Sequence, residues 1–192
     1  MLRSDMKRIA LHEAGHAVVA VHEGFRTPII RIGAWGADTY TQPGLPGASL
    51  SVYMRSRLRV LLAGAVAQCL MLCPEDGDGL NRALRGSDAS EDWAKAREII
   101  SLLIHERTGR RGWDGAYETM IDAIRDEVAA EIRRILEVNR TILEELADLT
   151  ICAFDDMREI GGDQAGDARH YVDLIAVEDV LHGITKITPG AT

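Results

Sequence analysis

Residues 4–23 read SDMKRIALHEAGHAVVAVHE and decide the fold of the chain. Apolar residues recur along this stretch at helical spacing, which predicts a helix. Ser4 or Asp5 can cap its start, and Gly24 followed by Pro28 ends it. The same stretch carries the residues with the clearest chemistry.

The pattern His-Glu-x-x-His occupies residues 12–16, in the middle of the predicted helix. His12 and His16 are four residues apart and share one helix face, so both imidazoles can reach a single ion. Zinc accepts two such nitrogens at roughly 2.0–2.1 Å and keeps positions for a further ligand and a water. Glu13 lies about 100° around the helix, where it can reach that water but cannot comfortably bind the ion. The spacing therefore predicts a hydrolase site with His12 and His16 as ligands and Glu13 as the general base.

The spacing does not identify the third metal ligand, because that ligand can come from a distant segment. Asp88, Glu91 and Asp92, at the start of a later predicted helix, are candidates. Acids in a first turn also complement the helix dipole without any metal. His105, near the end of the same helix, is a further candidate. The residues alone leave the choice open.

A strand is predicted over residues 28–35, because this segment is rich in β-branched residues. Its middle part, residues 29–34, could hold an extended substrate by edge pairing. The substrate-contacting residues would then be Ile30, Ile32 and Gly33. An ordinary half-buried sheet edge explains the same pattern equally well.

The rest of the chain is predicted to be mostly helical. In chain order we expect a turn or mobile loop at 41–47, a second short strand at 48–53, a buried helix at 54–72 and a glycine-rich excursion at 73–86. A helix at 88–107 follows, capped by Asp88 with Glu91 or by Ser87 or Ser90. After it we expect one long helix at 117–149, an acidic mobile loop at 155–169 and a short helix at 176–181. The long helix is inferred from an apolar stripe that runs from Ile121 to Leu149.

Charge and composition narrow the class of protein. The formal net charge is −8 and the pI about 5.2, which disfavours phosphate backbones and therefore nucleic acid as a partner. The longest apolar run, Val60 to Cys73, is interrupted by Gly64 and Gln68, so we expect no membrane span. The N-terminal residues do not resemble a signal peptide, and three cysteines do not describe a disulfide framework. We therefore expect a cytoplasmic protein.

Three stretches of the chain resemble the peptidase domain of the FtsH-type, membrane-bound, ATP-dependent zinc proteases. Residues 12–20, HEAGHAVVA, look like that family's opening motif almost letter for letter, and residues 61–68, LLAGAVAQ, are similar to its LGGRAAE helix. Residues 86–92, GSDASED, resemble its TGASND segment, whose last Asp is the third zinc ligand of the family. Carried over by position, the resemblance implies Zn2+ as the metal and Asp92 as its third ligand.

The chain departs from the family outside the hydrolytic site. No phosphate-binding loop of the form G-x-x-x-x-G-K-[ST] occurs in the sequence, so we expect neither an ATPase module nor ATP-driven unfolding. We expect no membrane anchor either. Gln68 stands where the family usually has an acid, and residues 155–172 look like additional sequence. The roles of both are open.

These features together predict a mainly α fold with a small β-sheet, which is the α+β class. It would have a zincin-like HExxH helix, a small sheet edge beside the cleft and a helical C-terminal half. At 192 residues, 46% of them hydrophobic, the chain is long enough for one compact domain. We expect a single metallopeptidase domain over 1–192, with the zinc-site core in 1–110, a helical part in 111–192 and a mobile loop near 155–172.

The predicted function is that of a zinc-dependent endopeptidase that cuts flexible or unfolded polypeptides without ATP. The alternative from another class is a catalytically silent zinc-binding adaptor or regulatory module that acts by binding a partner. Glu13 favours the enzyme, because a structural zinc needs no general base and is usually closed by four protein ligands. Hydrolysis of a non-peptide bond is a third interpretation. The expected partner is a peptide or protein substrate; a homo-oligomer and a separate ATPase or adaptor are left open.

Overall fold

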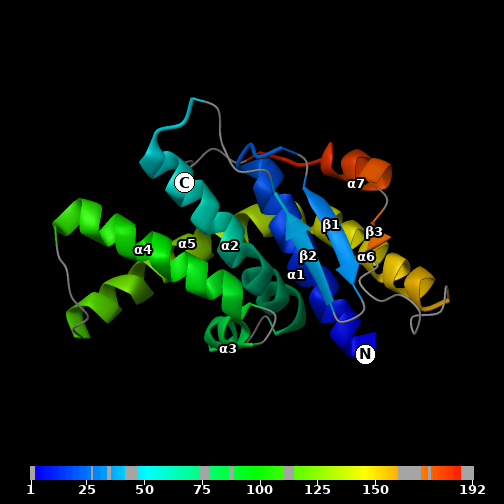
Figure 1. Ribbon diagram of the computed structural model, residues 1–192, viewed down its shortest axis with the longest axis horizontal. Coiled ribbons are helices and arrows are strands. Elements are labelled where there is room, and N and C mark those ends of the chain that lie inside the picture. The colour runs from blue at the N-terminus through cyan, green and yellow to red at the C-terminus, as the bar shows by residue number, and fades with distance from the viewer. Residues whose placement is uncertain are drawn as a thin grey trace.

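The computed structural model describes residues 3–26, 28–33, 36–41, 47–73, 78–86, 89–109, 115–159, 170–172 and 174–186. The elements, in chain order, are α1 (Arg3–His22), β1 (Ile29–Gly33), β2 (Gly36–Tyr40), α2 (Leu50–Leu72), α3 (Gly79–Arg85), α4 (Ser90–Thr108), α5 (Gly115–Val138), α6 (Arg140–Glu159), β3 (His170–Tyr171) and α7 (Leu174–Leu181) (Figure 1). The chain is mostly helical with a small antiparallel sheet, so the predicted mainly α member of the α+β class is confirmed.

Helix α1 is the centre of the fold, and every residue from Ile9 to Ala20 is buried. It packs against α2 and α6 and also contacts α5 and β2. The close approach of α1 to α2 depends on Gly15. A Cβ at this position would lie 2.6 Å from the side chain of Ala67 and 2.8 Å from the carbonyl oxygen of Ala63. Because no side chain fits there, Gly15 lets the two helices pack closely enough to place their side chains in one site.

The sheet is antiparallel, with the strand order β2-β1-β3. Strand β1 pairs with β2 in a register that puts Ile29 opposite Tyr40 and Gly33 opposite Gly36. The prediction of a strand after the first helix is confirmed, but the predicted second strand at 48–53 is wrong. Residues 50–53 are the start of α2, and the hydroxyl of Ser49 accepts a hydrogen bond from the Val52 amide and caps the helix.

The prediction that the 29–34 strand offers its edge to substrate is also wrong. Strand β1 is the middle strand and is paired with β2 on one side and β3 on the other. Ile30 and Ile32 are 0% exposed, so their side chains belong to the core. Gly33 is paired with Gly36 of β2. The free edge of the sheet beside the cleft is instead that of β2, whose outer side pairs with no strand among the described residues.

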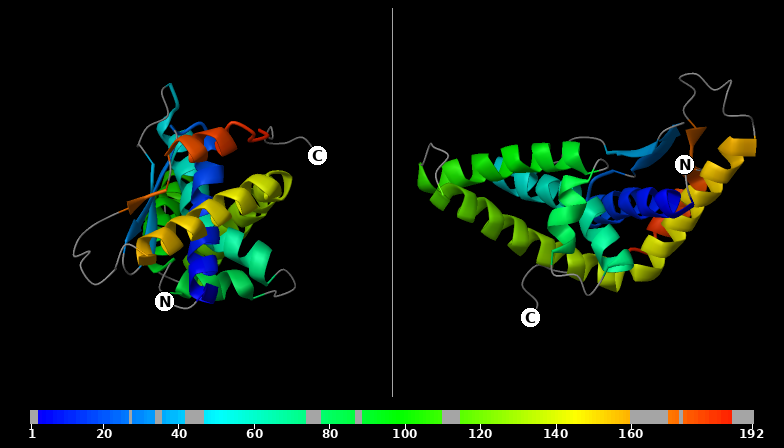
Figure 2. Two further views of the ribbon diagram at one scale, coloured as in Figure 1. Left: turned by 90° about the vertical axis from the view of Figure 1, so that its right-hand side faces the viewer. Right: turned by 90° about the horizontal axis from the view of Figure 1, so that it is seen from below.

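The predicted long helix at 117–149 is two helices, α5 and α6, which meet at an angle (Figure 2). The chain turns at Asn139, which is 2% exposed. Its amide nitrogen donates to the carbonyls of Ile135 and Thr185, at 2.8 and 3.0 Å, and its oxygen accepts from the Thr185 amide at 2.7 Å. The apolar stripe continues in both helices, so periodicity alone did not reveal the break.

The remaining predictions differ mainly at the ends of elements. Helix α6 extends to Glu159, so the first part of the predicted loop at 155–169 is helical, whereas residues 160–169 lie outside the described part. The excursion at 73–86 contains the short helix α3, and residues 74–77 are not described.

Helix α4 begins at Ser90 after Ala89, with no side-chain cap. Ser87 and Asp88, the other predicted caps, lie outside the described residues. The buried helix at 54–72 begins earlier than expected, and the helix at 176–181 is confirmed as α7.

The sequence predicts no membrane-spanning segment, and the helices of the structure can be compared with that prediction. Within the described ranges, none of them combines the length and the apolar character needed to cross a bilayer.

Candidate metal centre and active site

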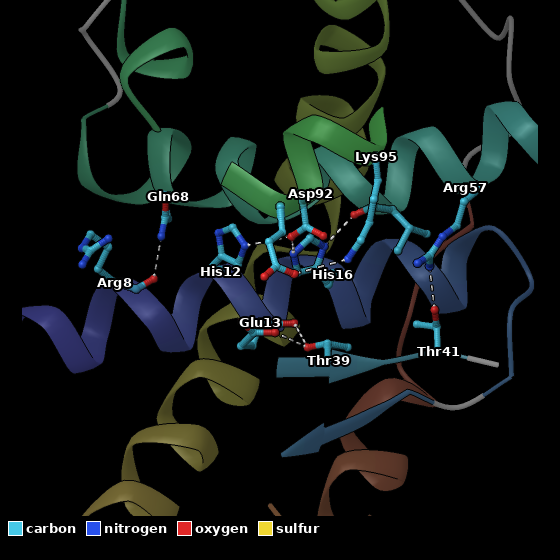
Figure 3. A network of polar contacts seen from close by, with 12 residues as sticks. Arg8, His12, Glu13, His16, Thr39, Thr41, Arg57, Gln68, Asp92 and Lys95 are labelled. Atoms are coloured by element: carbon cyan, nitrogen blue, oxygen red, sulfur yellow. Dashed lines mark hydrogen bonds and ion pairs between the residues drawn. The ribbon is translucent and has the colours of Figure 1, made fainter. Parts of the chain in front are cut away.

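The structure brings together the three predicted ligands His12, His16 and Asp92 (Figure 3). The histidines lie on adjacent turns of α1, and Asp92 comes from the first turn of α4, 80 residues further on. One ligand atom from each residue lies within 4.8 Å of the others. Oδ2 of Asp92 is 3.5 Å from Nε2 of His12 and 3.0 Å from Nε2 of His16. These separations are close to the ~3.3–3.5 Å between ligands of a tetrahedral zinc ion with bonds of ~2.0–2.1 Å.

The orientation of His16 fits a metal ligand. Its Nδ1 lies 2.6 Å from the carbonyl oxygen of Val60 in α2, so Nδ1 must carry the hydrogen and donate it. The lone pair of Nε2 is then directed to the point shared with Asp92. A hydrogen bond from the far nitrogen to a carbonyl is the usual device that fixes the tautomer of a metal-bound histidine. Two imidazoles and one carboxylate form a donor set suited to zinc.

Helix α2 also fixes the ring of His12. A Cβ added to Gly64 would lie 2.6 Å from three atoms of that ring. The imidazole therefore packs directly on the backbone of α2, and a glycine is required beneath it. The sequence did not assign Gly64 or Val60 to the site. A glycine inside a buried apolar helix, which costs about 1 kcal/mol relative to alanine, is the signal that could have indicated a close contact.

The charge of the cluster favours a cation between its members. Burial of Asp92 opposes ionisation, but hydrogen bonds with His12 and His16 outweigh it and hold the pKa of Asp92 well below its usual range. For His16, burial lowers the pKa, yet the contacts with Asp92 and Glu13 raise it above the ordinary value. A partly buried carboxylate between two imidazoles thus stabilises positive charge, whether it is carried by a proton or by a metal ion.

Glu13 lies beside the three ligands but points to β2 instead of the shared point (Figure 3). The hydroxyl of Thr39 in β2 is 2.7 Å from Oε2 of Glu13 and 3.0 Å from its backbone oxygen. Burial raises the pKa of Glu13 to about 7, against the opposing effects of His16 and Thr39. A carboxyl group with this pKa can both accept and release a proton near neutral pH.

Thr39 is the residue of the site that sequence reasoning missed most completely. It lies in a short strand of mixed polarity, and its contact with Glu13 depends on how β2 lies against α1. No motif in the sequence marks it.

An open cleft of about 890 Å³ leads to the cluster. It is bounded by α1, β2, α2 and the start of α4, and its lining includes Glu13, His16, Thr39, Arg57 and Asp92. A cleft of this size admits an extended peptide segment, and the catalytic candidates lie in its wall.

The other candidate ligands lie apart from the cluster. Glu91 is 89% exposed and forms an ion pair with Lys95 at 3.7 Å. His105 is exposed near the end of α4, and Asp88 is not described. Gln68 links α2 to α1, because its Nε2 donates to the backbone oxygen of Arg8 in α1 at 3.2 Å.

The comparisons with known proteins indicate a distant relationship. No family model matches the chain. The chain is similar to the ATP-dependent zinc metalloprotease FtsH 2 of Symbiobacterium thermophilum, with 28% identity over 195 aligned residues. The match covers 83% of this chain but 31% of the relative, so the chain spans about a third of that protein's length. This supports an FtsH-like relationship at a coarse level, in agreement with the three stretches that resemble the family.

Proposed function

We propose that the chain is a zinc-dependent endopeptidase that hydrolyses peptide bonds in flexible or unfolded polypeptides without ATP. The observation that carries this proposal is the position of Glu13. Its carboxyl group lies beside His12, His16 and Asp92, is buried to 6% exposure and is turned away from their shared point by Thr39. A site built only to hold a structural metal would have no use for such a group.

In the proposed mechanism His12, His16 and Asp92 hold the zinc ion. When bound, zinc supplies Lewis-acid polarisation of the scissile carbonyl and of the attacking water. Glu13 accepts a proton from that water and later delivers it to the nitrogen of the leaving amine. Thr39 keeps the carboxyl group of Glu13 directed into the cleft during both transfers, because its hydroxyl contacts the group directly.

The free edge of β2 is the proposed place for the substrate backbone. Residues 36–41 line the cleft, and the outer side of β2 has no partner strand among the described residues. An extended peptide can add to such an edge through main-chain hydrogen bonds. A folded segment has already used these groups in its own structure, which is why flexible chains are the expected substrates.

Compartment and partners follow from the same proposal. Cys69, Cys73 and Cys152 form no disulfide, which suits a reducing cytoplasm. A separate ATPase or adaptor, or a homo-oligomer, would be the partner that extends cleavage to folded substrates.

The test combines metal content with hydrolysis. Zinc per chain is measured by mass spectrometry, and cleavage of casein and of an unstructured fluorogenic peptide is followed with and without a chelator. The proposal expects one zinc per chain, hydrolysis that stops with the chelator and returns with Zn2+, and hydrolysis by Glu13→Gln that is lower by about 10²-fold or more. Full zinc occupancy without turnover of either substrate would instead support the zinc-binding adaptor.

A further inference from the structure

Arg57 differs from the other arginines near the cleft in its partners. Arg31 forms an ion pair with Asp38 across β1 and β2. Arg59 is held between Glu23 and Glu131, at 2.9 and 2.8 Å. Within the described part of the chain, the side chain of Arg57 makes one hydrogen bond, from Nη1 to the hydroxyl of Thr41 at 2.8 Å, and no ion pair.

The guanidinium of Arg57 is placed to receive an anion. It is half-buried and lines the cleft, so it has lost part of its hydration. A guanidinium carries five N–H donors, and the neutral hydroxyl of Thr41 uses one of them. The remaining donors match the two oxygens of a carboxylate, which is the partner that Arg binds in bidentate fashion.

Arg57 of α2 contacts the chain just after β2, and this point of contact determines which part of a substrate it would meet. Thr41 follows Thr39 by two residues, so their side chains lie on the same side of the extended chain, about 7 Å apart. The hydroxyl of Thr39 is hydrogen-bonded to Glu13, and the hydroxyl of Thr41 accepts a hydrogen bond from Arg57 (Figure 3). A peptide bond that reacts beside Glu13 is therefore about two residues away from the substrate side chain that faces Arg57.

The direction of pairing identifies the side of the scissile bond. We place the substrate antiparallel to β2, as β1 is on the other side of that strand. Strand β2 runs from Gly36 towards Thr41, so such a substrate begins at the Thr41 end. The residues that precede the scissile bond then lie next to Arg57, and the C-terminal carboxylate of the substrate lies at the other end.

From this arrangement we propose that Arg57 is a specificity-determining residue that selects substrates with Asp or Glu about two residues before the scissile bond. The inference rests on the proposed peptidase function. It adds a substrate class to that function: flexible polypeptides with an acidic side chain just N-terminal to the cleaved bond.

The experiment uses the full zinc-loaded chain and a series of unstructured peptides in which a single Glu is moved along both sides of one cleavage site. Each peptide has a matched version with Gln. The measured quantity is the ratio of kcat/KM for the Glu and Gln peptides. A charge-assisted hydrogen bond in a partly exposed cleft predicts a ratio of about ten at one position before the bond. Arg57→Gln brings the ratio close to one, and Arg57→Lys retains part of it.

Two matched variants locate the effect. Arg55→Gln removes a cation from the same helix that pairs with Glu127 and does not line the cleft, so its ratio stays at the wild-type value. Lys95→Gln removes the exposed cation of the cleft. Three results would each overturn the proposal. The first is loss of the preference in Lys95→Gln but not in Arg57→Gln. The others are equal rates for Glu and Gln peptides in the wild type, and a preference confined to residues after the bond.

A binding measurement separates this proposal from the peptidase function. Calorimetric titration of the zinc-loaded Glu13→Gln protein with the same peptide pairs requires no turnover. A tenfold difference in Kd that depends on Arg57 would support the acidic subsite even if the wild type hydrolysed no peptide. Equal Kd values, together with normal zinc-dependent hydrolysis in the wild type, would remove the subsite and leave the peptidase intact.

Discussion

The hydroxyl of Thr39 contacts Glu13 twice, at 2.7 Å from Oε2 and 3.0 Å from the backbone oxygen. A hydroxyl has one hydrogen to donate and can also accept. It therefore donates to the carboxylate when Glu13 is ionised. When Glu13 is protonated, the carboxyl group can donate to the hydroxyl, which then donates to the backbone oxygen. Both protonation states have a partner, so Glu13 can keep its orientation while it gains and loses a proton.

Replacing Thr39 with Val removes the hydroxyl at nearly constant volume. We expect kcat to fall about tenfold, the effect of losing a hydrogen bond to a charged group, while zinc content stays at the wild-type level. Thr39→Ser restores most of kcat. Thr119→Val is the control, because its hydroxyl bonds to the Gly115 carbonyl on an exposed helix. Wild-type kcat in Thr39→Val would show that Thr39 does not position Glu13.

Glu13→Gln keeps the shape of the side chain but removes its ability to accept a proton. Hydrolysis should fall by about 10²–10⁴ or more, the usual effect of a general base, with zinc still bound. Glu91→Gln is the matched control, since Glu91 lines the same cleft but is 89% exposed and contacts Lys95. Steady-state kinetics with zinc quantification checks both variants, and hydrolysis by Glu13→Gln at more than a tenth of the wild-type rate contradicts the assigned role.

Gly64→Ala tests the packing of His12 on α2. Its Cβ would lie 2.6 Å from three atoms of the imidazole and must displace the ring. We expect zinc affinity to fall about 10–100-fold, as when the groups that orient a ligand are disturbed. Competition with a chromophoric chelator measures the affinity, and circular dichroism reports folding. Gly115→Ala is the control, because nothing lies within 4 Å of a Cβ there. Unchanged affinity in a folded Gly64→Ala protein would mean that this contact does not set the ligand geometry.

Glu23, directly after the end of α1, predicts a pH dependence of stability. Burial raises its pKa, but hydrogen bonds with His22, Ser56 and Arg59 outweigh burial and lower it overall. A lowered pKa in the folded state stabilises the fold above the unfolded value of about 4.3, and the effect is lost as the pH falls through the folded pKa. Glu23→Gln should lower the free energy of unfolding by ~1–3 kcal/mol at pH 7.

Urea unfolding at pH 7 and at acidic pH checks this prediction. The difference between wild type and Glu23→Gln should shrink at acidic pH. Glu137→Gln, which removes an exposed pair with Arg133 at 3.9 Å, should change stability by less than ~0.5 kcal/mol. A difference that grows as the pH falls would contradict the assigned sign.

The part of the site that lies within one helix could be read from the sequence. Spacing placed His12 and His16 on one face and Glu13 outside it, because the geometry of an α-helix relates residues four apart. Helix geometry could not single out Asp92, since it comes from α4; the residues alone left it as one of several candidates, and the family resemblance selected it. Thr39 depends on the register of β2 against α1, which no local pattern encodes.

Two of the errors in the fold have a similar physical origin. The break at Asn139 depends on hydrogen bonds to Thr185, 46 residues away, and both flanking helices keep an apolar face. Strand β2 is short and partly polar, so its sequence shows no alternation of apolar and polar residues. The role of β1 as the middle strand depends on β3, which comes from the end of the chain. Contacts between distant segments therefore decided the break at Asn139 and the middle position of β1, whereas β2 carries too weak a local pattern to be recognised.

Anomalous diffraction at the zinc edge, from crystals of the zinc-loaded chain, locates the metal without reference to activity. We expect a single zinc peak at ~2.0–2.2 Å from Nε2 of His12, Nε2 of His16 and a carboxylate oxygen of Asp92, with Glu13 outside the ligand set. A peak at another place, or a zinc ion bound directly by Glu13, would contradict this expectation.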